Sequence, residues 1–339
     1  MDGFRLLIEL GLSIVPVVTF LLSLVLLDSY KLLSLRNLLI AITGGALVAI
    51  ASYFVNVPLL NSGVMSGQST IRYLTPLVEE IGKALVCVLL FRLNRIGFMV
   101  DAAIYGFAIG AGFACVENVY FIHATVDANM MTWLVRGFGT AIMHGGATAI
   151  YCVITRYALD RWSKTTTLAL LPGLVVAYVL HSTYNHFVLP PVPSALLLLI
   201  VLPIVMIAVF QQSERLTRDW LGVGFDTDQE LLGMILAGEV SDSKVGHYLD
   251  ELRSRFSGEV VLDMMCWLRL HLELAIEAKG LLMMRQAGFS PEPSKAAKAK
   301  FAEISYLEKS IGKTGLLAIA PFVHTSNREL WQLYMLGKS

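Results

Sequence analysis

Long apolar stretches separated by short polar breaks dominate the first two thirds of the chain. A membrane-spanning helix needs about 20 mostly apolar residues. Segments of that kind run over about Glu9–Leu27, Asn37–Val57, Tyr73–Leu93, Phe98–His123, Met131–Tyr157, Leu168–Leu189 and Pro193–Phe210. The pattern therefore predicts an all-α fold, with a polytopic membrane helix bundle of about seven transmembrane helices over residues 1–210.

The pattern changes from about Gln211, where apolar positions recur with a helical period among many charged residues. A long helix is predicted at Val260–Gln286, interrupted too often by charge to face lipid. A proline-rich break follows, then a helix at Lys295–Ser310 and a short one at Glu329–Leu336. Residues 211–339 are predicted to form a soluble helical domain without a catalytic motif, and we expect it to recruit a protein partner, self-associate or regulate.

Composition agrees with this division. Hydrophobic residues make up 56% of the chain and charged residues only 15%, against about 25% charged in a soluble domain. The first 210 residues hold 11 of the 26 Lys and Arg and nine of the 26 Asp and Glu. The tail is therefore not basic, which argues against nucleic acid as a partner. The four cysteines form no C-x-x-C motif, so they indicate neither a zinc ribbon nor a redox centre.

Basic residues are concentrated in alternate loops, and this predicts the orientation of the bundle. Loops on the cytoplasmic side of a membrane carry an excess of Lys and Arg. The loops after the first, third, fifth and seventh segments carry Lys31, Arg36, Arg92, Arg95, Arg156, Arg161, Lys164, Arg215 and Arg218. We therefore expect the N-terminus outside and the C-terminal domain in the cytoplasm.

Ionisable and amide side chains interrupt four of the apolar segments. A charge at the centre of a bilayer costs about 2.5–3.5 kcal/mol by insertion scales, so such groups usually face an interior and carry function. With a rise of 1.5 Å per residue, they lie roughly 9 to 20 Å below the outer boundary. One shared site in the outer half of the bundle is therefore predicted from Glu79-Glu80-x-x-Lys83, Glu117-Asn118, His144 and His181-x-x-x-Asn185.

Helical spacing limits how these groups pair, without deciding it. Lys83 is four residues after Glu79 and three after Glu80, so it can pair with either acid. Arg136 lies one turn into the fifth segment, where it can pair with a site acid or extend to the membrane surface. Small residues that let helices approach closely are expected at Gly106, Gly110, Gly112, Gly145 and Gly146.

These motifs, in this order and each on its own segment, resemble those of the PrsW family. PrsW proteins are bacterial intramembrane proteases related to the CAAX-prenyl protease superfamily. The resemblance covers about Tyr73–Leu189. Phe113-x-x-x-Glu117 favours the PrsW branch, because the CAAX enzymes have His at the last position.

The resemblance implies an intramembrane endopeptidase in the bacterial inner membrane, surrounded by lipid bilayer. Its expected substrate is a single-span membrane protein cleaved near the outer half of the bilayer, and the family role is the first cleavage of a membrane-bound anti-sigma factor. The catalytic candidates are Glu79, Glu80, Glu117, His144, His181 and Asn185, with Lys83, Asn118 and Arg136 in support.

Amide hydrolysis needs an activated water, stabilisation of an oxyanion and a proton for the leaving amine. One of Glu79 and Glu80 is expected to be the general base. We place Glu80 first, although the sequence does not separate them. Asn185 and a histidine are expected to hold the oxyanion.

A zinc ion is the second version of this chemistry. Three protein ligands and one water form the usual catalytic zinc site, and Glu117, His144 and His181 supply a Glu and two His. The helical H-E-x-x-H signature is absent, so the ligands would come from three helices. Hydrolysis with Zn²⁺ and hydrolysis without metal both remain open.

An ion- or proton-coupled transporter is the alternative function, because intramembrane Glu, His and Asn also build proton relays and ion sites. Transporters usually carry repeats with broken helices at matching positions. The sequence shows no such repeat, so the protease is the preferred hypothesis.

Overall fold

The computed structural model describes residues 3–28, 33–125, 128–161, 166–242, 244–289, 291–292 and 294–319. These residues are helical almost throughout and include no strand. The chain divides into two compact units, Met1–Ser213 and Glu214–Ser339. The predicted helix at Glu329–Leu336 lies outside the described residues.

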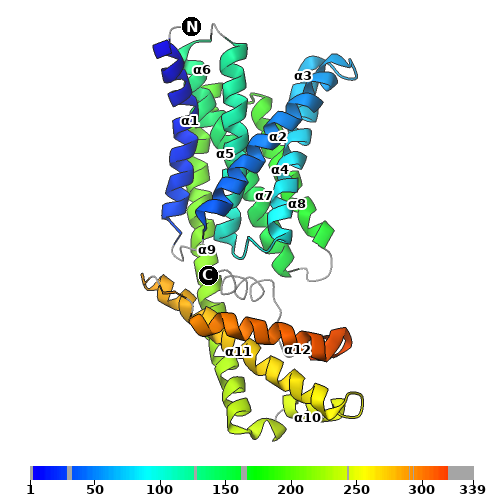
Figure 1. Cartoon of the computed structure of the whole chain (residues 1–339). Helices are drawn as coiled ribbons and strands as arrows, with labels where there is room; N and C mark the ends of the chain where they lie inside the picture. Colours follow the sequence, from blue (N-terminus) through cyan, green and yellow to red (C-terminus); the bar gives the residue numbers. More distant parts are fainter. Residues whose placement is uncertain are drawn as a thin grey trace. The chain divides into compact units, whose positions relative to one another are not determined.

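Unit 1 is a bundle of long helices (Figure 1). Its helices are α1 (Gly3–Leu26), α2 (Leu35–Asn61), α3 (Gly67–Ser69), η1 (Thr70–Leu74), α4 (Thr75–Arg92), α5 (Met99–Ala124), α6 (Met130–Val135), η2 (Arg136–Ala141), α7 (Ile142–Arg161), α8 (Thr166–Asn185) and the first part of α9 (Pro191–Ala237). The segments η1 and η2 are π-helical, a form often found at functional sites. They lead directly into α4 and α7.

Six helices in the described part of the chain are long and apolar enough to cross a membrane. They are α1, α2, α5, α8, α9 and the stretch from α6 to α7. The seventh predicted span corresponds to α4, an 18-residue helix. By length and composition the count is therefore six rather than seven, because α4 carries Glu79, Glu80, Lys83 and Arg92.

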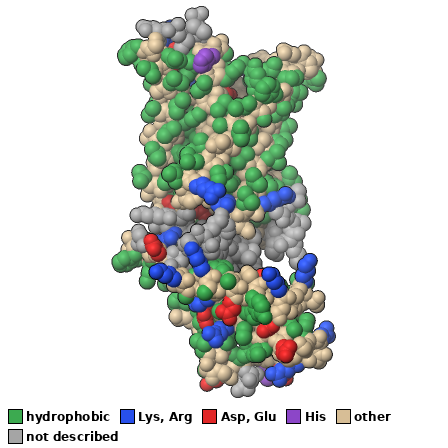
Figure 2. All heavy atoms as spheres, in the orientation of Figure 1, with side chains coloured by type: hydrophobic (Ala, Val, Ile, Leu, Met, Phe, Trp, Pro, Cys, Tyr) green, Lys and Arg blue, Asp and Glu red, His purple; other side chains and the backbone are tan. Residues whose placement is uncertain are grey.

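Three of the four charged residues of α4 point inward, and the fourth, Arg92, is exposed in its last turn. Glu79, Glu80 and Lys83 are buried, whereas Leu85 and Leu89 on the same helix are exposed. The helix thus keeps an apolar outer surface while it carries polar groups into the bundle. Figure 2 shows that hydrophobic side chains dominate the visible face of unit 1, as expected of a protein in lipid.

Helix starts follow from local capping. Ser34 accepts a hydrogen bond from the backbone N–H of Asn37 at the start of α2. Asp101 accepts hydrogen bonds from the N–H groups of Gly97 and Phe98 at the start of α5. The bonds to Asn37 and Phe98 satisfy donors that a helix leaves unpaired at its start. Asp101 therefore acts as a cap.

Helix α5 is buried along most of its length and packs against α1, α2, α4 and α7. A Cβ added at Gly112 would lie 2.0 Å from the carbonyl oxygen of Ile42 in α2, and one added at Gly110 would lie 2.2 Å from that of His144. The predicted close approach at these glycines is confirmed, and it brings α2 and α7 to the central helix.

Unit 2 consists of the end of α9 with η3 (Glu239–Asp242), α10 (Lys244–Leu252), α11 (Gly258–Gln286) and α12 (Lys295–Ile319). The helix predicted at Val260–Gln286 is α11. The one predicted at Lys295–Ser310 is the first part of α12, which is interrupted by a non-helical Gly312 with a φ of 71°. No helix boundary falls near Phe210, because α9 continues to Ala237. Apolar side chains of α10, α11 and α12 form a separate core, including Leu249, Met264, Leu268 and Ile311.

Candidate proteolytic site

The first part of the site is an ion pair within α4. Lys83 donates a hydrogen bond of 2.5 Å to Oε1 of Glu80, and both side chains are at most 2% exposed. The structure therefore pairs Lys83 with the acid three residues before it, a choice that spacing left open. The Lys83 ammonium also lies 4.6 Å from the ring centroid of Phe113 in α5.

Two histidines from α7 and α8 contact this pair. His181 Nδ1 lies 2.8 Å from Glu80 Oε1, and His144 Nδ1 lies 3.1 Å from Lys83 Nζ. The partners assign the tautomers. His181 donates its Nδ1–H to the carboxylate, and His144 Nδ1 accepts from the ammonium. The two rings lie 4.7 Å apart and nearly perpendicular.

The third part comes from α5 and η2. Arg136 donates through Nη2 to Glu117 Oε2 and through Nε to Asn118 Oδ1, each at 2.9 Å. Glu117 Oε2 also lies 3.3 Å from His144 Nε2. Arg136 thus pairs with a site acid. Its side chain is 15% exposed and that of Glu117 is 22% exposed, so this pair forms the accessible edge of an otherwise buried site.

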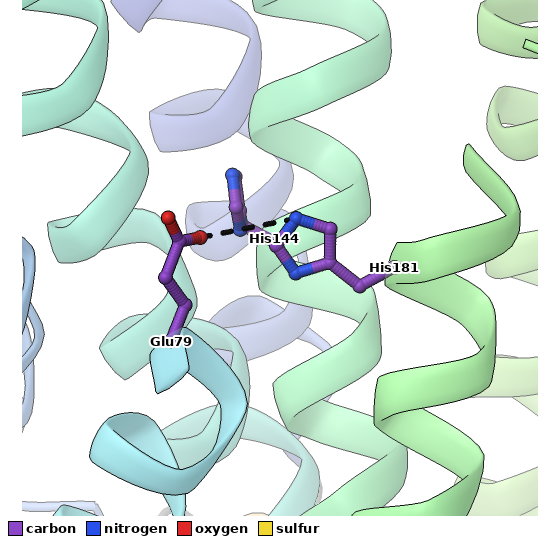
Figure 3. Close-up of side chains that lie close together, drawn as sticks. All are labelled: Glu79, His144 and His181. Carbon is purple, nitrogen blue, oxygen red and sulfur yellow. Dashed lines mark ion pairs between the residues drawn. The ribbon is translucent and has the colours of Figure 1, made fainter. Parts of the chain in front are cut away.

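Glu79 occupies the other end of the network. Its Oε1 accepts a hydrogen bond of 3.1 Å from Asn56 Nδ2 of α2. Its Oε2 is buried and has no hydrogen-bond partner among the residues that the structure describes. It lies 3.8 Å from Nε2 of His181 (Figure 3). Since His181 carries its proton on Nδ1, a lone pair of Nε2 faces a carboxylate oxygen.

The contacts join the predicted residues into one network. It runs through Asn118, Arg136, Glu117, His144, Lys83, Glu80, His181, Glu79 and Asn56. Asn118 extends it to α1, because its Nδ2 donates to the Ser13 carbonyl oxygen.

Asn185 lies apart from this network. Its amide donates to the carbonyl oxygen of Ile71 in η1, and Ser182 donates to that of Arg72. Within the described residues, Asn185 makes no hydrogen bond to another candidate site residue. The structure therefore places this amide where it holds the end of α8 against η1.

Asn56 was not among the candidates from the sequence. It is 9% exposed and lies near the end of the apolar helix α2. The rule applied to the other segments, that a polar group is costly in lipid, also applies to an uncharged amide. The second apolar segment therefore contained a signal for Asn56, although an amide is weaker evidence for a functional site than a charged group.

Three of these side chains form a possible metal site. Glu79, His144 and His181 converge from α4, α7 and α8, and one donor atom of each lies within 4.8 Å of the others (Figure 3). Glu79 here takes the place that the sequence hypothesis gave to Glu117. The Glu117 carboxylate pairs with Arg136 instead.

The charge of the network also fits a cation. Glu80 pairs with Lys83 and Glu117 with Arg136, so Glu79 is the acid of the network that has no paired Lys or Arg among the described residues. Glu79 Oε2 and His181 Nε2 present free lone pairs. His144 fits less directly, because both ring nitrogens have partners. It would have to release Lys83 or Glu117 to bind a metal.

Comparison with known proteins agrees with this arrangement. A family model described as PrsW family intramembrane metalloprotease matches residues 34–210, slightly more than half of the chain. The comparisons with curated proteins and with solved structures gave no match. The matched region contains every residue of the network, from Asn56 to His181. The chain therefore belongs to the PrsW family of intramembrane metalloproteases.

Proposed function

We propose that unit 1 hydrolyses a peptide bond of a membrane-bound protein with a water activated by Glu79. The observation that carries this assignment is the pair of acceptors formed by Glu79 Oε2 and His181 Nε2, 3.8 Å apart. Two facing lone pairs repel unless one of the two atoms is protonated, or a group with two hydrogens or a positive charge lies between them. A water molecule can donate one hydrogen to each.

The proposed reaction needs no covalent intermediate with the protein. Glu79 takes a proton from the water while the water oxygen bonds to the carbonyl carbon of the substrate. The carbon–nitrogen bond then breaks, and Glu79 returns the proton to the leaving amine. General base catalysis of this kind contributes typically 10²- to 10⁴-fold in rate.

Glu80 serves a different purpose in this scheme. Its Oε1 already accepts from both Lys83 and His181, so it is less available to a water than Glu79. It fixes the tautomer of His181 and keeps Nε2 directed at Glu79. We therefore assign the base to Glu79 in place of Glu80, which the sequence had favoured.

Stabilisation of the oxyanion falls to the remaining donors of the network. Asn185, the expected donor, is occupied at η1. His144 Nε2–H and the Arg136 guanidinium both face Glu117 at the accessible edge. We assign the oxyanion to these two groups, which would have to exchange the Glu117 carboxylate for it, since donors aimed at developing charge act strongly.

The family name implies a metal, and Glu79, His144 and His181 are the residues that would hold it. A bound zinc ion makes its water acidic enough to ionise near neutral pH and polarises a carbonyl. The unpaired Oε2 and the lack of a paired Lys or Arg at Glu79 support this reading. In either version Glu80 orients His181 and Asn56 orients Glu79.

The expected substrate is a single-span membrane protein, with membrane-bound anti-sigma factors as the family example. Cleavage is expected near the outer half of the bacterial inner membrane, because the loop charges orient the site towards that side. Bound lipid and the single-span substrate are the expected partners of unit 1. For unit 2 we propose a regulatory or partner-binding role.

The proposal is tested by comparing membrane proteins from cells that express the wild-type chain or Glu79→Gln. New N-terminal peptides of single-span proteins should appear only with the wild type. Cleavage of one such protein by the purified enzyme should fall at least about 10²-fold in Glu79→Gln.

Glu9→Gln is the matched control, because Glu9 is also buried in unit 1 but pairs with Arg5 in α1. It should cleave at the wild-type rate. Full activity of Glu79→Gln would refute the assignment of the base. Metal analysis of the wild type and of His181→Ala separates the two versions, since only a metal enzyme would contain zinc that the variant loses.

A further inference from the structure

Asn56 is the contribution of α2 to the site. Its position follows from a buried face of α2 that includes Ala41, Gly45, Ala49, Ser52 and Asn56 at spacings of three and four residues. The structure places this face against α4 and α5, and Asn56 is the member of it that reaches the network.

Close packing fixes α2 at this place. A Cβ added at Gly82 of α4 would lie 2.6 Å from Val48 of α2, and one added at Gly45 would lie 1.8 Å from the carbonyl oxygen of Ile109 in α5. The backbones of α2 and α5 therefore approach closely, and the side chain of Val48 packs directly on Gly82 of α4. The amide of Asn56 is held by two helix contacts rather than by a mobile loop.

Glu79 takes its hydrogen bond from Asn56, whereas Lys83 pairs with Glu80. The other two acids of the network each have a cation, at 2.5 Å for Glu80 and 2.9 Å for Glu117. In the described part of the chain, Glu79 Oε1 is bonded by Asn56 alone. Glu79 and Lys83 are four residues apart on one helix, a spacing at which opposite charges normally pair.

We propose that Asn56 is a positioning residue of the proteolytic site, which holds Glu79 towards His181 and so keeps Lys83 on Glu80. Without the amide, Glu79 would turn to Lys83. Glu80 would then share its cation, and His181 would lose part of the support for its orientation. This inference rests on the proposed role of Glu79 as the base.

The carbonyl oxygen of Asn56 supports the inference. Asn56 Oδ1 is buried and finds no hydrogen-bond partner within the described parts of the chain, and the same holds for Glu79 Oε2. A side chain that served only to join helices would be expected to satisfy both ends of its amide. The bonded end of Asn56 is instead the end that faces a reacting group.

The test uses the purified full chain and the single-span substrate found with the wild type. Asn56→Leu keeps the volume of the side chain and removes both polar atoms. We expect kcat to fall about 10- to 100-fold, the usual effect of losing a group that orients a reactive residue. KM should stay within about twofold and the thermal midpoint within a few degrees, because the shape of the contact is retained.

Asn37→Leu is the matched control. Asn37 lies on the same helix with the same exposed fraction of 9%, but it bonds Arg95 away from the site. Its kcat should remain at the wild-type value. A drop in activity of Asn56→Leu that merely follows a loss of folded protein would overturn the proposal, as would an unchanged kcat.

A second measurement does not depend on cleavage. An experimental structure of Asn56→Leu should show the Glu79 carboxylate on Lys83, and a Glu79 that still faces His181 would overturn the proposal. A wild-type chain that cleaves no protein would refute the proposed function, while this structure would still decide whether Asn56 positions Glu79.

Discussion

His271 in α11 shows how a single residue outside the membrane spans is governed by its surroundings. It is 7% exposed and stacks on Trp267 with ring centroids 5.0 Å apart. Burial lowers the pKa of His271 from 6.5 to about 4, although the nearby Asp228 carboxylate opposes the shift. The imidazole is therefore neutral in folded unit 2 at neutral pH.

We predict that unit 2 loses stability in acid because of His271. The unfolded chain protonates this residue near pH 6.5 and the folded chain near pH 4, so its contribution is complete above pH 6.5 and declines as the pH falls towards 4. The total loss is up to about 3 kcal/mol. Hydrogen exchange of α11 in the full chain at pH 7.5 and pH 5 measures it.

His271→Leu should make the free energy of opening of α11, obtained from its protection factors, nearly independent of pH in this range. The control is His247→Gln, because His247 is exposed and its replacement should leave the pH dependence unchanged. Equal pH dependence in the wild type and His271→Leu would contradict the prediction.

At the scale of elements, glycine contacts position the helices that carry the site. The Gly110 contact places α5 against the backbone of His144 itself, and the Gly112 contact places it against α2. A bilayer offers little hydrophobic drive for helix association, so close van der Waals packing supplies much of the stability. The same contacts therefore set both the stability and the geometry of the site.

Gly112→Ala is predicted to destabilise unit 1, because its Cβ would overlap the Ile42 carbonyl oxygen. Overpacking of this kind costs about 1–3 kcal/mol. Gly11→Ala is the control, since a Cβ at Gly11 meets nothing within 4 Å. Thermal unfolding in detergent should show a lower midpoint for Gly112→Ala only. Equal midpoints for the two variants would show that the α2–α5 contact is not as tight as described.

At the scale of the whole molecule, the loop charges predict an outside N-terminus and a cytoplasmic unit 2. Ser62 follows α2 on the side expected outside, and Cys266 is exposed in unit 2. In intact cells, Ser62→Cys should react with a membrane-impermeant maleimide, whereas Cys266 should react only after permeabilisation. The opposite labelling would reverse the orientation and place the site in the inner half.

Much of the architecture could be predicted from the sequence, because lipid imposes a simple rule. Only helices satisfy their own backbone groups in a bilayer, so long apolar runs must be helical. The same rule marks Glu79, Glu80, Glu117, His144 and His181 as residues with a purpose. Helix α4 carries Glu79, Glu80, Lys83 and Arg92. These charges make it the one predicted span that is too polar to qualify as a membrane helix by composition.

The sequence by itself determined the helical class, the division into a membrane unit and a charged unit, and the residue types of the site. Only the tertiary structure decided which partner each group takes. Helical spacing lets Lys83 pair with either of two acids. It also leaves open whether Asn185 bonds a side chain of the site or a backbone carbonyl group. The reason is that periodicity orders residues along one helix only. Contacts between helices pair Lys83 with Glu80, send Asn185 to Ile71 and bring Asn56 to Glu79.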